Sequence, residues 1–303
     1  MPQYSHCSNR ARLRINLLPF ATVDSKPCLF CGKPLRGKLR SKEHIVAAWL
    51  QKHLGIRYEQ VEFVLRDSSW SVNGNRNLVF DRYLAGHVCE ECNTGWMSKL
   101  EVAVSKFLPD LISGGSFASD LESGSDRTAL ARWVAKSAYC VDSASMRQER
   151  RVPSSHARRL FEDRAGLPPG VSVLAGRNPF YIPFHVMEIP AWATLVTERT
   201  PGGPQRHAEL SECSYKIGFQ FGHLMLAVYH WPEPTDSIAV VDGVHEPIRW
   251  DGEVRPIIAE SSYCANTPLE VFNAFIMYII PVPAGTNTGD QTISDVRLLN
   301  PIT

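Results

Sequence analysis

The hydrophobic positions of the first 112 residues alternate between helical and strand spacing. Residues 45–54, IVAAWLQKHL, carry apolar side chains at helical spacing and are followed by Gly55, a residue common just after a helix C-terminus. Residues 58–65, YEQVEFVL, alternate between apolar and polar positions, as a half-buried strand does. A second helical pattern covers residues 94–112, and its apolar face consists of Trp96, Leu100, Val104 and Leu108.

The rest of the chain opens with one helical pattern and continues with strand patterns. Residues 113–126, SGGSFASDLESGSD, are small and polar, which is typical of a linker. Residues 127–141, RTALARWVAKSAYCV, predict a helix. Apolar segments that predict strands follow at 180–189, 192–199, 214–221, 223–231, 237–244 and 254–260.

These patterns predict an α+β protein in two parts. We expect a head over residues 1–112, a linker over 113–126, and a strand-rich, mainly antiparallel α+β domain over 127–303. A chain of 303 residues is long enough for two such cores.

The composition argues against a membrane or secreted protein. No apolar run reaches the ~18–20 residues that span a bilayer, and the longest candidate, 274–285, contains Pro281 and Pro283. The first 20 residues are polar and basic where a secretory signal has its apolar segment. We therefore expect a cytoplasmic protein with reduced thiols.

The formal net charge of +1 conceals an asymmetry along the chain. Residues 1–110 hold 16 basic and 10 acidic side chains, a net of +6, whereas the remainder holds 16 basic and 21 acidic ones, a net of −5. A basic excess at one end favours a polyanion partner there, and a solvated basic tail is the alternative for the first residues.

Four of the eight cysteines form two CxxC pairs, Cys28/Cys31 and Cys89/Cys92. CxxC spacing lets both sulfur atoms of one tight turn point the same way, and two such turns supply the four thiolates of a tetrahedral Zn²⁺ site. A redox pair needs only one CxxC at the start of a helix, and a disulfide framework conflicts with reduced thiols. The sequence therefore predicts structural zinc.

An acid followed by a histidine, Glu43-His44, lies between the two pairs, and Asn93 directly follows the second. With the cysteines, this order over residues 25–105 resembles the zinc-containing members of the HNH endonuclease superfamily, whose fold is the ββα-metal fold. The family has a further asparagine between the pairs. Asn77 is the best match, and Asn73 and Asn75 are alternatives.

The resemblance implies a role for each of these residues. His44 would be the general base that activates water, since a neutral imidazole accepts protons near neutral pH. Glu43 and Asn93 would hold a catalytic divalent ion, Mg²⁺ or Mn²⁺, and Asn77 would orient the loop that carries His44. The structural alternatives are that Glu43 and His44 form the first turn of the 45–54 helix with Ser41 as its N-cap, and that Asn93 caps the next helix.

Basic residues precede His44 in a turn-rich loop, 32–42, that can follow a phosphate backbone. The candidate nucleic-acid-binding residues are Lys33, Arg36, Lys38, Arg40, Lys42 and Lys99.

The sequence thus favours a metal-dependent HNH-type endonuclease that acts on DNA rather than RNA. The rivals are a non-catalytic zinc-ribbon nucleic-acid-binding protein and a regulatory protein with purely structural zinc. The second part contains no motif linked to chemistry, and we expect it to contact a protein partner or a second copy. A nuclease head joined to an unrelated domain is common in bacterial defence and mobile-element systems.

Overall fold

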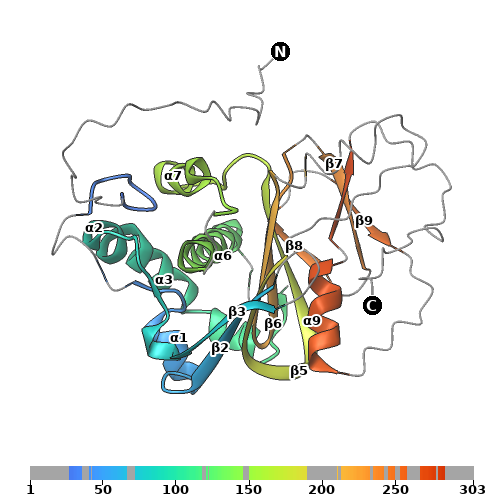
Figure 1. Ribbon diagram of the computed structural model, residues 1–303. Helices are drawn as coiled ribbons and strands as arrows, with labels where there is room; N and C mark the ends of the chain where they lie inside the picture. The colour runs from blue at the N-terminus through green and yellow to red at the C-terminus, as the bar shows by residue number, and fades with distance from the viewer. Residues whose placement is uncertain are drawn as a thin grey trace, which may run out of the picture.

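The computed structural model of the 303-residue chain is shown in Figure 1. It describes residues 27–35, 41, 43–66, 72–117, 121, 123–145, 150–189, 210, 213–232, 235–241, 245–249, 253–257, 267–277 and 279–283. Helices and strands are mixed, as expected for an α+β protein. In this part of the chain, no helix has the length and apolar character needed to cross a membrane.

The head is built around two short paired strands. Strand β1 (Glu43–His44) runs antiparallel to β4 (Leu84–Ala85), with Glu43 opposite Ala85 and His44 opposite Leu84. Between them the chain forms three further elements: helix α1 (Ala48–His53), the antiparallel pair β2 (Gln60–Arg66) and β3 (Val72–Val79), and the 3₁₀-helix η2 (Phe80–Arg82). The inserted segment returns the chain to β1, so strands distant in sequence become neighbours.

A helical run follows the second CxxC. It comprises α2 (Glu90–Cys92), the π-helical turn η3 (Asn93–Met97) and α3 (Ser98–Val104), and Gly95 has non-helical dihedral angles inside it. A separate helix, α4 (Leu108–Ile112), comes next. The single helix expected over 94–112 is therefore interrupted after Val104, where Phe107 buries its ring and Pro109 lies in the first turn of α4.

Helix α6 (Gly124–Ala144) is the central element of the protein. Figure 1 shows it between the head helices and the long strands β5 (Val171–Ile189) and β6 (Tyr215–His230). Residues 130–142 of α6 are all buried, as expected for a helix covered on every side. Helix α7 (Ser154–Glu162) follows it and carries a partly exposed basic face.

The second part contains two three-stranded sheets. One has the order β6-β5-β8, with β8 at His245–Arg249, and is antiparallel. The other has the order β10-β7-β9, built from β7 (Thr235–Val241), β9 (Glu253–Ile257) and β10 (Ile280–Pro283), and its β7–β9 pair is parallel. Helix α9 (Pro268–Met277) covers β5 and β6 on the side opposite α6 (Figure 1).

Strand β6 joins two segments that the sequence pattern separates. The strands expected at 214–221 and 223–231 form one strand, buried along nearly its whole length. Gly222 sits at their junction with φ +59°, and a β-carbon there would lie 2.7 Å from the carbonyl oxygen of Ile112. Only glycine fits this close approach without strain, so the strand continues instead of turning.

One hydrophobic core runs through the head and the second part. It extends from Phe30 beside the first CxxC, through Trp133 of α6, to Val228 of β6. Leu121, in the expected linker, is buried, and α6 already begins at Gly124. The division into a head over 1–112, a linker over 113–126 and a second domain over 127–303 stays a prediction.

Candidate metal centre and active site

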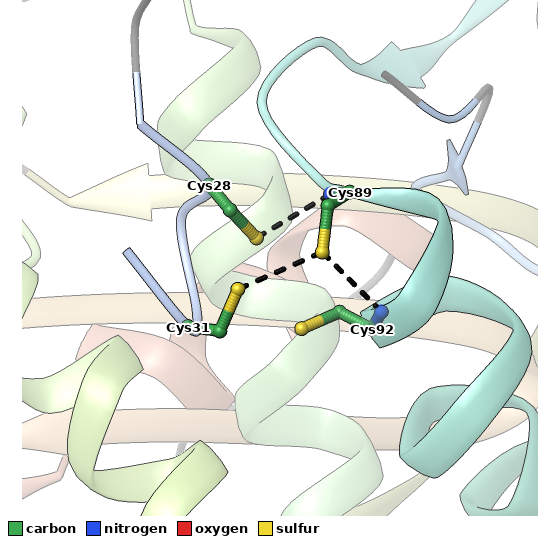
Figure 2. A group of neighbouring side chains, drawn as sticks. All are labelled: Cys28, Cys31, Cys89 and Cys92. Atoms are coloured by element: carbon green, nitrogen blue, oxygen red, sulfur yellow. Dashed lines mark hydrogen bonds between the residues drawn. The ribbon is translucent and has the colours of Figure 1, made fainter. Parts of the chain in front are cut away.

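The four cysteines of the CxxC pairs meet in space. Each can offer one sulfur atom, and the four sulfur atoms all lie within 4.8 Å of one another; Cys31 Sγ and Cys89 Sγ are 3.6 Å apart. Figure 2 shows the side chains converging from two segments, Cys28 and Cys31 from a loop, and Cys89 and Cys92 from the N-cap and the last residue of α2. Tetrahedral zinc with Zn–S bonds of about 2.3 Å requires sulfur atoms roughly 3.8 Å apart.

Backbone hydrogen bonds build each turn of this cluster. In the first, the N–H of Gly32 donates to the carbonyl of Cys28, and Gly32 has φ +72°. In the second, the N–H of Cys92 donates to Cys89 Sγ at 3.4 Å. The N–H of Cys89 donates to Cys28 Sγ at 3.3 Å and thereby links the two turns. Such N–H donors stabilise negatively charged sulfur.

The electrostatics of the cluster favour one thiolate, at Cys28, while burial raises the pKa of Cys89 to about 11. Hydrogen bonds from the Cys92 thiol and from backbone N–H groups outweigh burial and lower the pKa of Cys28 to about 4. The same thiol-to-thiolate bond raises the pKa of Cys92, because one proton is shared between the two sulfur atoms. A divalent cation would end the sharing of one proton between Cys28 and Cys92, because it would bind all four cysteines as thiolates. The cysteines fit a structural metal ion such as zinc.

Glu43 and His44 point to opposite sides of β1, because successive residues of a strand alternate. Glu43 faces the interior and is 5% exposed. His44 lies at the surface with a quarter of its side chain exposed. They are in a strand, and α1 begins only at Ala48, so the alternative that they form the first turn of that helix is wrong.

His44 has an acidic neighbour that the sequence did not suggest. Its Nε2 atom lies 3.4 Å from Oδ1 of Asp81 in η2, and the same oxygen accepts a hydrogen bond of 2.9 Å from Nε of Arg57. All three side chains are partly exposed. Asp81 and His44 are 37 positions apart, and the β1–β4 pairing brings η2 beside β1. No local motif marks this pair.

The carboxylate of Glu43 is engaged by a lysine of the second part. Lys136 Nζ lies 3.0 Å from Glu43 Oε1 and 2.9 Å from Oε1 of Glu101 in α3. The Lys136 side chain is fully buried. Burial opposes its charge, but the two glutamates outweigh this effect and raise the pKa of Lys136. Burial raises the pKa of Glu43 more than Lys136 lowers it.

As arranged, Glu43 does not fit a divalent ion, because an ammonium group already occupies its buried oxygen. Among the described residues, a metal site needs at least three His, Cys, Asp or Glu side chains whose ligand atoms converge, and the four cysteines meet this condition. The catalytic Mg²⁺ or Mn²⁺ therefore stays a prediction.

The candidate asparagines lie in two places. Asn93 is half-buried in the first turn after the second CxxC, with its N–H bonded to the carbonyl of Cys89. Cys89, whose sulfur accepts from the Cys92 N–H, is the N-cap of α2 and Asn93 is its C-cap, so the alternative that Asn93 is the N-cap of the helix is wrong. Asn77 is exposed on β3, opposite Glu62, and Asn75 donates to the same glutamate. Asn73 also belongs to β3.

The described residues show no hydrogen bond or ion pair that links His44 to Glu43, Asn93 or Asn77. The catalytic roles expected for Glu43, Asn93 and Asn77 therefore stay predictions.

Two of the candidate nucleic-acid-binding residues are described. Lys33 lies beside the first CxxC and forms an exposed ion pair with Glu91 of α2, which raises the pKa of Lys33. Lys99 is exposed on α3. The other four, Arg36, Lys38, Arg40 and Lys42, lie outside the described residues.

Comparison with known proteins gives no match: no protein-family model, no curated protein and no solved structure matches the chain.

Proposed function

We propose that the protein is a zinc-stabilised endonuclease of the HNH type that hydrolyses phosphodiester bonds, in DNA rather than RNA. The observation that carries the proposal is the order of elements around the cysteine cluster. Strand β1 with His44 pairs with β4, and the second CxxC then opens the helical run that contains Asn93. Two antiparallel strands and a helix, joined at a four-cysteine cluster, support the ββα-metal arrangement that we propose.

The position of His44 supports its role as general base. It is partly exposed, and Asp81 faces one of its ring nitrogens. If Nε2–H points to Asp81, the other nitrogen holds the lone pair that accepts a proton. His44 would take a proton from water, the resulting hydroxide would attack phosphorus, and the bond to the 3′ oxygen would break as that oxygen takes up a proton.

A cleavage assay with a matched pair of histidine variants tests the proposal. Zinc-loaded protein would be incubated with supercoiled plasmid and, in parallel, with single-stranded RNA, in Mg²⁺ or Mn²⁺. His44→Ala should lower the nicking rate by about 10²–10⁴-fold. His53→Ala, an exposed histidine on α1, should retain the wild-type rate. Nicking by the His44→Ala variant at the wild-type rate would contradict the proposed nuclease function.

The buried pair of Glu43 and Lys136 favours a second candidate, a non-catalytic zinc protein that binds nucleic acid. A carboxylate neutralised by lysine is a structural anchor, and the head could then bind phosphates without cutting them. Salt-dependent DNA binding without cleavage in any divalent metal would select this candidate.

A further inference from the structure

An exposed tyrosine lies close to the acidic neighbour of His44, and the proposed function gives it no role. Tyr58 is 76% exposed, more than any other large hydrophobic side chain in the described part of the protein. The guanidinium carbon of Arg57 lies 5.5 Å from the centre of its ring. Nε of Arg57 in turn donates to Oδ1 of Asp81, the oxygen that faces His44. One series of contacts therefore joins His44 to an exposed aromatic ring.

A turn between α1 and β2 fixes the backbone that carries this ring. Arg57 and Tyr58 occupy its two central positions, and the N–H of Glu59 closes it by donating to the carbonyl of Ile56 at 3.0 Å. Ile56 is buried and anchors the turn in the core. The carbonyl of Arg57 also accepts a hydrogen bond of 3.0 Å from the N–H of Asp81, so backbone and side chain both attach the turn to η2.

The side chains of Arg57 and Tyr58 retain groups that no described residue engages. The side chain of Arg57 donates a hydrogen bond through Nε, and its two terminal nitrogens form none within the described residues. The hydroxyl of Tyr58 forms no hydrogen bond there either. A guanidinium group binds phosphate through its N–H donors, and an aromatic ring stacks on the face of a base. The pair thus matches the two chemical parts of a nucleotide.

We propose that Arg57 and Tyr58 form a binding site for single-stranded DNA, in which the Arg57 guanidinium contacts a phosphate and an unpaired base stacks on the Tyr58 ring. The inference rests on the proposed function for the class of ligand, nucleic acid, and it adds the strandedness of the bound segment. The net charge of +6 over residues 1–110 attracts such a polyanion. The bonds of Asp81 place the bound strand beside His44, the candidate general base.

Stacking explains why the bound segment is single-stranded. In a duplex, neighbouring base pairs cover both faces of each base, and a protein reaches only the base edges in the grooves. An unpaired base exposes a face, and its stacking on an aromatic side chain does not depend on the sequence. Tyr58 therefore distinguishes strandedness and leaves the base identity open.

Binding to oligonucleotides, measured without cleavage, tests the proposal. Fluorescence anisotropy would follow zinc-loaded protein binding to a labelled oligothymidylate and to a labelled duplex of mixed sequence, with no added Mg²⁺ or Mn²⁺. Tyr58→Ala should weaken binding of the single strand by about tenfold and change duplex binding by less than about twofold. Tyr58→Phe should retain the wild-type affinity for both, because stacking requires the ring and not the hydroxyl.

An exposed tyrosine of the second part supplies the matched control. Tyr181 of β5 is 51% exposed, and its ring packs on His223, with 5.5 Å between the ring centres. Tyr181→Ala should retain the wild-type affinity for the single strand. Unchanged single-strand affinity in Tyr58→Ala would overturn the proposal, as would an equal loss of duplex affinity or an equal loss in Tyr181→Ala. A wild type that does not bind the single strand would overturn it as well.

The salt dependence of binding tests the phosphate contact of Arg57. Arg57→Gln removes one cation, so the slope of log affinity against log salt concentration for the single strand should become shallower by about 0.7. Tyr58→Ala keeps this cation and should keep the wild-type slope. An unchanged slope in Arg57→Gln would overturn the phosphate contact.

The binding and cleavage assays fail separately. Loss of single-strand affinity in Tyr58→Ala, in a protein that cuts no nucleic acid, would support the binding site and contradict the nuclease function. Cleavage that depends on His44, with single-strand affinity unaffected by Tyr58→Ala, would support the nuclease and overturn the binding site.

Discussion

The ammonium group of Lys136 lies 3.0 Å from the carboxylate of Glu43, although the residues are 93 positions apart in the chain. This contact joins the central helix to the first strand of the head, inside a continuous core. Glu43, for which a metal-binding role stays a prediction, is therefore part of the attachment between the two parts of the protein.

Breaking this pair should destabilise the protein. Glu43→Gln leaves a buried ammonium group with Glu101 alone, and we expect a loss of about 3 kcal/mol in the free energy of unfolding, measured with urea. The exposed pair of Lys33 and Glu91 is the control, because Glu91→Gln should cause no measurable change. Equal effects of the two substitutions would show that burial does not strengthen the pair.

The cysteine cluster should hold zinc that the fold requires. We expect one zinc ion per chain by elemental analysis, and a lower melting temperature for Cys92→Ser with loss of that ion, because metal binding contributes directly to folding. Cys213→Ser, which changes a cysteine outside the cluster, should retain both zinc and melting temperature. Full zinc content in Cys92→Ser would contradict a four-thiolate site.

Asp81 should affect cleavage through His44. Asp81→Asn keeps the shape of the side chain and removes the negative charge that faces Nε2 of His44, so the single-turnover cleavage rate should fall by about tenfold. The exposed Asp110 of α4 is the control, and Asp110→Asn should retain the wild-type rate. An unchanged cleavage rate in Asp81→Asn would show that Asp81 has no role in cleavage and only binds Arg57.

Two histidines of the second part should make stability depend on pH. His156 Nδ1 lies 3.0 Å from the hydroxyl of Tyr215, and the rings of His156 and His230 are 4.5 Å apart. Burial lowers the pKa of His156 to about 4. Burial and the neighbouring His156 lower the pKa of His230 to about 3. Both imidazoles are therefore neutral in the folded protein at pH 5.

The unfolded chain binds more protons than the folded one below pH ~6.5, because its histidines titrate normally. Stability should thus be complete above this pH and fall on acidification towards pH ~4, by on the order of 1–2 kcal/mol per histidine at pH 5. Urea unfolding at pH 7 and at pH 5 measures this difference in the free energy of unfolding. His156→Gln should reduce the difference, and the exposed His53→Gln should not. A wild type equally stable at both pH values would contradict the burial of neutral imidazoles.

Local chemistry explains what could be predicted. CxxC turns orient their own sulfur atoms, and helix 127–141 follows from spacing within a few turns; the observed α6 is longer by only three residues at each end. The interruption after Val104 could not be predicted, because it depends on where Phe107 is buried. The continuous strand β6 likewise depends on Gly222 meeting Ile112 of the head.

The sequence by itself determined the cysteine cluster, the α+β class and the position of His44 between the two CxxC pairs, because each depends on residue types at short spacing. The tertiary structure decided which side chains face Glu43 and His44. Strand alternation sends them to opposite sides, and their partners, Lys136 and Asp81, come from distant segments whose positions are set by packing around α6 and by the β1–β4 pairing.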